Sequence, residues 1–306
     1  MKPNYNNLKR VLDSGEFAVT AELGPPISVD SDIIIKKAKI LKGYIDAFNV
    51  TDGQTAVVRM SSWATCLLAK EQGLEPIVQM TTRDRNRIAL QMDILGIAAL
   101  GIKNILCLTG DHTSFGNHAK AKGVWDIDSI QLIRIVKNMR DEKKFDSGDK
   151  IDIFPYLYIG GAANPFAEPF EFRVPRLTKK VVEGVDFIQT QCIFNIEKFT
   201  EWMKAVREKG LHKKIKILAG ITPIKSVGAA KYMKNKVPGM DVPDSVIDRL
   251  EKTPNNKVPR EGIKIAIETI NKVQQIEGVS GIHLMAIEWE EIVPEIIKSA
   301  GLYPRP

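Results

Sequence analysis

The sequence has few of the residues that bind metals or form disulfide bonds. Its 306 residues include three cysteines and four histidines. Cys66, Cys107 and Cys192 lie far apart, so the chain alone lacks the ligand spacing of a cysteine-rich zinc site or an iron–sulfur cluster. The scattered histidines form no His-x-His pair, which argues against a barrel metallohydrolase. We therefore expect buried, reduced thiols and no metal site.

Long apolar runs are also missing. No stretch approaches the roughly 18 apolar residues of a membrane-spanning helix. The polar segment 1–16 lacks the apolar stretch of a signal peptide. These two absences predict a cytoplasmic protein with no membrane span.

Charge is the one strong compositional bias, with a net value of +7. No helix-turn-helix, zinc-finger or aromatic-basic motif accompanies it, so we expect no nucleic-acid partner. An anionic small molecule or an acidic protein partner explains the charge equally well.

Strand-like apolar segments alternate with amphipathic segments of helical period along the whole chain. We predict eight strands, near residues 16–22, 45–50, 75–79, 103–108, 152–158, 186–191, 215–220 and 281–286. Alternation without hairpin signals indicates a parallel sheet, and eight repeats favour closure into a barrel over an open sheet. The prediction is an α/β protein with a single (β/α)8 TIM barrel domain over residues 1–306.

Two polar segments interrupt this alternation. Residues 112–124 follow the fourth strand and read as a long loop on the ligand-binding face, either a lid or a flexible insertion. Residues 234–260 are rich in proline and predict an extra helical segment before the last strand. Neither segment resembles a linker between domains.

Polar residues follow or end several predicted strands, where a parallel α/β fold binds its ligands. Glu22 precedes the rigid Gly24-Pro25-Pro26 turn, and burial beside apolar walls would suit a carboxyl group to general acid catalysis. A structural ion pair across the barrel mouth is an equal alternative for Glu22. No predicted strand ends in lysine, which disfavours a Schiff-base aldolase, and no GxGxxG follows the first strand, which disfavours open-sheet dinucleotide binding.

Basic residues line one face of a predicted helix. Arg173, Arg176 and Lys180 are spaced i, i+3 and i+7, which places them on one side. A phosphate group would fit there, although a solvated basic surface is the commoner explanation.

Several segments together resemble the methylenetetrahydrofolate reductase family, from about Phe17 to Tyr303. The matching positions, in order, are Glu22 before Pro25-Pro26, Asn49-Val50-Thr51, Thr81, Leu108-Thr109-Gly110-Asp111, Asn164-Pro165, Lys180, Thr190-Gln191, Ala219-Gly220-Ile221-Thr222-Pro223 and the closing Gly301-Leu302-Tyr303. Members of this family are flavin-dependent barrels that reduce 5,10-methylenetetrahydrofolate to 5-methyltetrahydrofolate.

The resemblance implies roles for individual residues. Glu22 matches the general acid that gets a proton to N10 of the folate, and Asp111 matches the aspartate whose charge stabilises the resulting 5-iminium cation. Gln191 matches a folate-contacting glutamine. The implied cofactor is FAD, with FMN as the alternative, and the implied cofactor-binding residues are Thr51, Gln79, Thr109, Gly110, Asp111, Asn164, Arg176 and Lys180.

Some positions depart from better-known bacterial members. Gln79 stands where they have a histidine, Thr109 where they have an arginine, and Val227 where they have an aromatic residue. The electron donor therefore stays open between NAD(P)H and a reduced partner subunit that carries an iron–sulfur cluster or a flavin.

We expect an oligomer. The alternative functions are a non-redox folate-dependent methyl or one-carbon transferase and a folate-binding subunit of a larger complex.

Overall fold

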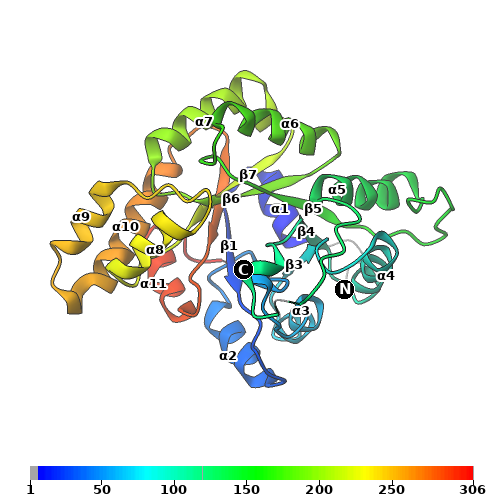
Figure 1. Ribbon diagram of the computed structural model, residues 1–306, viewed down its shortest axis with the longest axis horizontal. Coiled ribbons are helices and arrows are strands. Elements are labelled where there is room, and N and C mark those ends of the chain that lie inside the picture. Colours follow the sequence, from blue (N-terminus) through cyan, green and yellow to red (C-terminus); the bar gives the residue numbers. More distant parts are fainter. Residues whose placement is uncertain (1–5, 119, 306) are drawn as a thin grey trace.

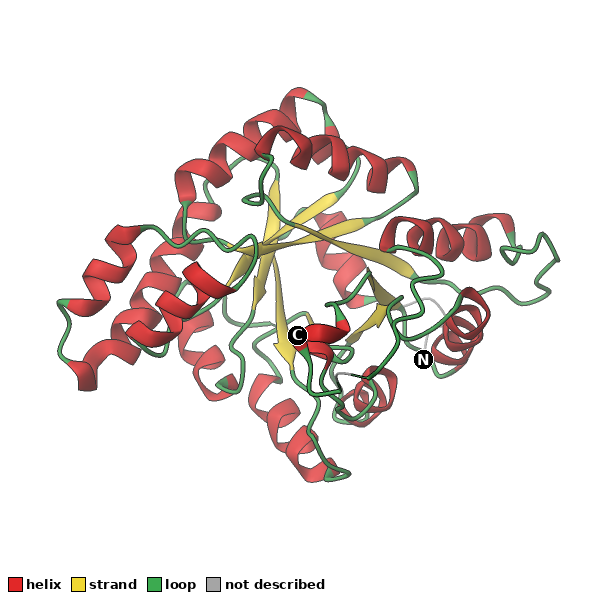
Figure 2. Cartoon of the chain, in the orientation of Figure 1, coloured by secondary structure: helices red, strands yellow, loops and turns green. Residues whose placement is uncertain are grey.

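The strands of this protein close into a parallel β-barrel surrounded by helices (Figures 1 and 2). The computed structural model describes residues 6–118 and 120–305. Strand order around the barrel follows the sequence, from β1 to β8, and β8 pairs with β1 to complete the ring. The predicted TIM barrel is therefore confirmed.

The strands and helices alternate as the sequence predicts. The strands are β1 (Ala18–Leu23), β2 (Ala47–Val50), β3 (Pro76–Thr81), β4 (Asn104–Leu108), β5 (Tyr158–Ala163), β6 (Phe187–Cys192), β7 (Lys216–Ile221) and β8 (Val279–Leu284). The main helices are α1 (Asn7–Ser14), α2 (Ser31–Leu41), α3 (Ser62–Lys70), α4 (Arg87–Ala99), α5 (Ser129–Lys137), α6 (Arg173–Val182), α7 (Ile196–Glu208), α8 (Val227–Lys236), α9 (Asp244–Glu251), α10 (Val258–Val273) and α11 (Val293–Ser299). Helix α9 is the extra segment expected before the last strand. Among the described residues, no helix has the length and apolar character needed to cross a membrane.

Helix α1 closes the amino-terminal end of the barrel. Its Leu8, Val11 and Leu12 are almost fully buried. They pack against the lowest inward-facing side chains of the strands, among them Phe187 and Leu218. A helix seated on this apolar layer leaves the opposite end of the barrel as the place where a ligand can enter.

The interior changes from apolar to polar toward the carboxyl ends of the strands. Side chains two residues apart on a strand share a face, so Ala18, Thr20 and Glu22 of β1 form a column that becomes more polar with height. The buried Gln189 and His283 continue the polar layer on β6 and β8. The fold thus concentrates hydrogen-bonding groups at one end of the barrel.

The predicted position of one strand was wrong. The fifth strand was expected at 152–158, but β5 occupies Tyr158–Ala163. Its Gly160 and Gly161 weaken a strand signal in sequence, yet space demands glycine here because a Cβ at position 160 would lie 2.3 Å from the Phe187 ring. Bulky Phe187 fills the barrel where Gly160 leaves room.

All three cysteines are buried and reduced, as predicted. Cys107 and Cys192 lie inside β4 and β6, and Cys66 lies in α3. Burial raises the pKa of each thiol, so these groups stay protonated at neutral pH.

Candidate active site

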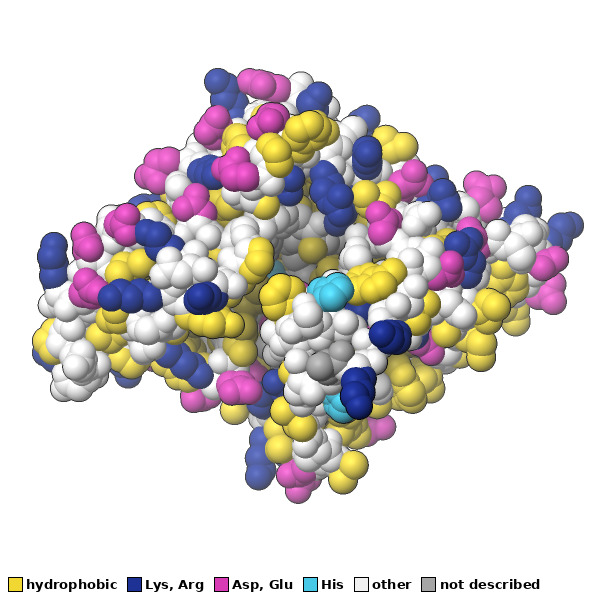
Figure 3. All heavy atoms as spheres, viewed as in Figure 1, with side chains coloured by type: hydrophobic (Ala, Val, Ile, Leu, Met, Phe, Trp, Pro, Cys, Tyr) yellow, Lys and Arg dark blue, Asp and Glu magenta, His cyan; other side chains and the backbone are white. Residues whose placement is uncertain are grey.

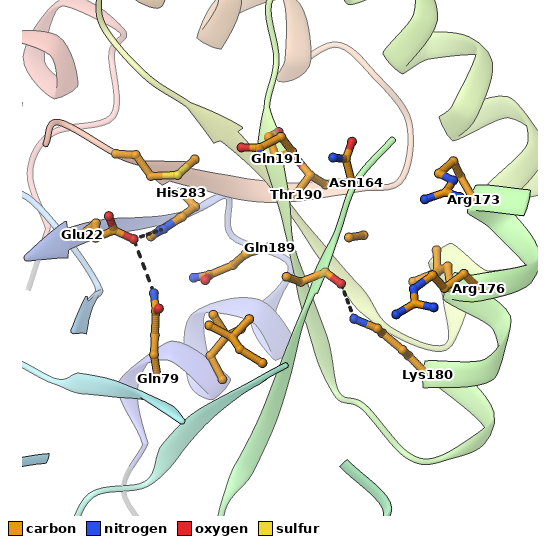
Figure 4. Close-up of a pocket in the computed structure, with 16 residues that line it drawn as sticks. Glu22, Gln79, Asn164, Arg173, Arg176, Lys180, Gln189, Thr190, Gln191 and His283 are labelled. Atoms are coloured by element: carbon orange, nitrogen blue, oxygen red, sulfur yellow. Dashed lines mark hydrogen bonds and ion pairs between the residues drawn. The ribbon is translucent and has the colours of Figure 1, made fainter. Parts of the chain in front are cut away.

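A cavity of about 330 Å³ opens at the carboxyl end of the barrel. Figure 3 shows a hollow near the centre of this face, with Lys and Arg side chains along part of its edge. The wall is formed by residues of β1, β3, β4, β5, β6 and β8 together with helix α6. Figure 4 shows that its charged groups lie on two sides, with the carboxylate of Glu22 facing three basic residues of α6 across the cavity.

The acidic side of the cavity is built around Glu22. Its Oε2 accepts a hydrogen bond from Gln79 Nε2 at 3.4 Å and lies 3.8 Å from His283 Nε2. The Glu22 side chain is 15% exposed, so the carboxyl group is accessible from the cavity while most of its surface is covered. Glu22 therefore has His283, and not a basic residue of α6, as its neighbour within ion-pair distance.

A buried hydrogen-bond network supports this side from below. Asn49 and Gln189 exchange two hydrogen bonds, of 2.7 and 2.9 Å, across the barrel. Gln189 Nε2 also donates to Thr20 Oγ1 at 3.3 Å, and Thr20 Oγ1 lies 3.0 Å from His283 Nδ1.

The sequence analysis did not identify Thr20, Gln189 and His283 as site residues. Their signal was available, since polar residues at period two in otherwise apolar strands mark an inward-facing polar layer.

The basic side of the cavity comes from α6. Arg173, Arg176 and Lys180 all line the cavity, which confirms that they share one helix face. The Lys180 ammonium group is buried and donates to the carbonyl oxygen of Ala162. Burial, followed by repulsion from Arg176, lowers the pKa of Lys180 to about 8. An anion in the cavity would relieve both effects.

Two amide side chains complete the wall between these sides. Gln191 Oε1 accepts from the backbone N–H of Cys192 at 2.9 Å, which leaves its NH₂ group directed at potential ligands. Asn164 Oδ1 similarly accepts from the N–H groups of Phe166 and Ala167, at 2.9 and 3.2 Å. Each amide is therefore oriented by the backbone and keeps its donor nitrogen for the cavity.

Four residues that were predicted for the site do not line this cavity: Thr51, Thr109, Gly110 and Asp111. The Asp111 carboxylate accepts from the N–H of Thr55 at 2.7 Å, and Thr109 Oγ1 accepts from the N–H of Ser129 at 3.2 Å. Gly110 adopts a φ of +89°, and a Cβ there would lie 3.1 Å from Thr81 Cβ. Their roles stay predictions.

Thr51 differs from the other three because its hydroxyl has no partner. Its Oγ1 is buried without a hydrogen bond within the described chain. Leaving such a group unpaired costs roughly 1–3 kcal/mol. A ligand that supplies a hydrogen bond here would recover that energy.

Comparisons with known proteins agree on one family. The family model described as methylenetetrahydrofolate reductase matches residues 7–301. Methylenetetrahydrofolate reductase 2 of Schizosaccharomyces pombe is 28% identical over 269 residues, which cover 82% of this chain and 39% of that protein. Methylenetetrahydrofolate reductase (NADH) 1 of Arabidopsis thaliana is 23% identical over 317 residues, covering 97% of this chain and 50% of that protein. This chain thus spans half or less of these relatives.

A solved structure supports the same fold. It is a Clostridium thermocellum protein described as binding two copies of 5-methyl-5,6,7,8-tetrahydrofolic acid. Its TM-score is 0.65 at 14% identity, and the match covers 96% of this chain and 98% of that one. At this identity the likeness establishes the fold alone.

Proposed function

The chain belongs to the methylenetetrahydrofolate reductase family, and from that premise we propose that it reduces 5,10-methylenetetrahydrofolate to 5-methyltetrahydrofolate. The observation that carries the proposal is the cavity with a carboxyl group on one side and three cations on the other. That arrangement suits two ligands. The carboxyl group can protonate the ring system of one ligand, and the three cations can bind an anionic group of the other. The folate bound by the Clostridium thermocellum protein supports a folate as the substrate class.

The residues present fit a flavin cofactor. Arg173, Arg176 and the buried Lys180 supply cations for a phosphate group. The unpartnered Thr51 hydroxyl and the glycine at position 110 offer a hydrogen bond and a close backbone approach. When bound, the flavin would supply the hydride that reduces the substrate carbon. FAD is the expected form, and FMN is the alternative.

The protein's own contribution is binding, orientation and one proton. Glu22 would protonate N10 of the folate, which opens the five-membered ring of the substrate and leaves the 5-iminium cation. The negative charge of Asp111 is proposed to stabilise this cation. Gln191 would orient the substrate through its free NH₂ group. The remaining cofactor contacts are proposed for Gln79, Thr109 and Asn164.

The electron donor is proposed to be NAD(P)H or a reduced partner subunit. The NADH named for the Arabidopsis thaliana relative supports the first route. Among the described residues that line the cavity, none is Phe, Tyr or Trp, so no large aromatic side chain is positioned there to stack on a nicotinamide. Anaerobic reduction of the bound flavin by NADH alone would support the direct route, and failure of NADH with success of a reduced ferredoxin-type protein would support the partner route.

An absorption spectrum of the purified protein tests the proposal, followed by identification of the released flavin. A flavin spectrum with bound FAD or FMN, together with 5-methyltetrahydrofolate formation, is the expected result. A colourless protein that binds tetrahydrofolate would instead indicate a non-redox transferase or a folate-binding subunit. Loss of methylenetetrahydrofolate turnover in Glu22→Gln separates the enzyme from that binding subunit.

A further inference from the structure

A second cavity, of about 390 Å³, meets the candidate active-site cavity at Glu22. Its walls come from the loop after β1, from Lys37 of α2, from the segment between β2 and α3, and from Ile287 and Glu288 after β8. Helices α2 and α3 lie side by side on this flank of the barrel (Figure 1). Helix α6 follows β5, which lies across the ring of strands from β1. The second cavity therefore extends from Glu22 away from the basic side of the first.

The second cavity combines a rigid apolar wall with an arginine that lacks an acidic partner. Pro25, Pro26 and Ile33 supply the apolar surface. Arg59 Nη1 donates to the carbonyl oxygen of Pro25 at 3.0 Å, and the buried Nε has no hydrogen-bond partner within the described chain. Arg59 also borders two neighbouring cavities, so its guanidinium can be reached by a ligand. The positive charge is therefore held in place by the backbone and is free to bind an anion.

The other charged groups of this cavity make Arg59 the place for an anionic group. Lys37 is already neutralised, because its ammonium group lies 2.6 Å from Oε1 of the buried Glu290. Glu22 and Glu288 also line the cavity, and both would repel an anion when ionised. A carboxylate in this cavity is therefore stabilised at Arg59 and disfavoured near the two acidic residues.

We propose that the second cavity binds the p-aminobenzoyl-glutamate tail of the folate substrate, with a tail carboxylate on Arg59. This inference rests on the proposed function. In a folate, N10 carries the benzoyl group, and the glutamate follows through an amide bond. A substrate whose N10 takes the proton of Glu22 must therefore extend its tail from Glu22.

The two cavities divide the ligands between them. The first cavity holds the pterin ring and the flavin, whose phosphate binds to the cations of α6. The tail leaves Glu22 on the opposite side, where Pro25, Pro26 and Ile33 face its benzene ring. The guanidinium of Arg59 then forms charge-assisted hydrogen bonds with a carboxylate of the glutamate.

Calorimetric binding of two folates to the purified protein tests the tail site. The probes are 5-methyltetrahydrofolate and 5-methyltetrahydropteroate, which lacks the glutamate, and the protein is kept reduced without oxygen so that neither probe reacts. We expect the wild type to bind the first probe about 10- to 100-fold more tightly than the second. This preference should disappear in Arg59→Gln. The exposed Arg134→Gln on α5 is the matched control and should keep it.

The comparison of two probes within one variant removes any general loss of affinity caused by the lost hydrogen bond to Pro25. Should Arg59→Gln not fold, Arg59→Met removes the same charge and should give the same result. A wild type without the preference, or a preference that persists in the Arg59 variants, would overturn the tail site and leave the proposed function standing. Failure of the wild type to bind either probe would reject the proposed function, and the tail site with it.

Discussion

Two sets of strand-end residues behave differently in this barrel. The cavity set consists of Glu22, Gln79, Asn164 and Gln191, which face a common space. The loop set consists of Thr51, Thr109, Gly110 and Asp111, which lie outside that space. Both sets follow or end predicted strands in the sequence. The difference shows that a position at a strand end predicts the face of the barrel but not whether a side chain points inward.

Two members of the loop set, Thr109 and Asp111, are hydrogen-bonded to the backbone of neighbouring loops. Thr109 and Asp111 accept backbone hydrogen bonds from Ser129 and Thr55, which organise the loops after β4 and β2. Residues of the cavity set keep hydrogen-bonding capacity for a ligand, as Gln191 and Asn164 do with their NH₂ groups. We therefore expect substitutions in the cavity set to have the larger effects on chemistry.

Glu22→Gln should have the largest effect. The amide keeps the size of the side chain and can still face Gln79 and His283, but it cannot supply a proton. We expect methylenetetrahydrofolate turnover to fall by about 10²- to 10⁴-fold with flavin content unchanged. Steady-state kinetics measures this, with the exposed Glu208→Gln on α7 as the control. Turnover within twofold of the wild type would remove Glu22 from the chemistry.

Asp111→Asn tests whether a residue of the loop set takes part in the reaction. The amide keeps an oxygen for the Thr55 N–H but removes the negative charge. We expect turnover to fall by about tenfold to a hundredfold through weaker stabilisation of the substrate cation. Asp126→Asn, in the same loop and paired with Arg87, should leave turnover unchanged. Equal turnover in both variants would mean that Asp111 only shapes its loop.

Lys180→Met tests how much the basic side of the cavity contributes to flavin binding. Removing a buried charged donor should cost about 1.5–3 kcal/mol of anion binding, which is about 10- to 100-fold in flavin affinity. Quenching of flavin fluorescence on binding reports the dissociation constant. The exposed Lys179→Met on the same helix is the matched control. Equal losses in the two variants would indicate a general effect of surface charge.

The pH dependence of flavin binding should be the smallest of these effects. Since the pKa of Lys180 is about 8, the free protein carries this charge below pH 8 and loses it above. A bound anion favours the charged form, so affinity should fall as pH rises from 7 to 9, by at most about tenfold per pH unit. In Lys180→Arg this decline should disappear, because arginine stays charged. A decline that persists in that variant would assign it to another group.

The sequence predicted the barrel well because strand and helix periodicity are local properties. It failed at β5, where Gly160 is required by a close contact with Phe187, a residue of the next strand. It also missed Thr20, Gln189 and His283, because their roles depend on which residues meet across the closed barrel. Glu22, Gln191 and the basic face of α6 were predicted, since a strand position and a helical spacing are enough to place them.

A single-turnover experiment tests the central claim most directly. Protein loaded with flavin is reduced chemically without oxygen and mixed with 5,10-methylenetetrahydrofolate while the flavin absorbance is followed. We predict that the flavin spectrum returns as one equivalent of 5-methyltetrahydrofolate forms, and that Glu22→Gln slows this by about 10²- to 10⁴-fold. A reduced flavin that persists in the wild type with the folate bound would contradict the account.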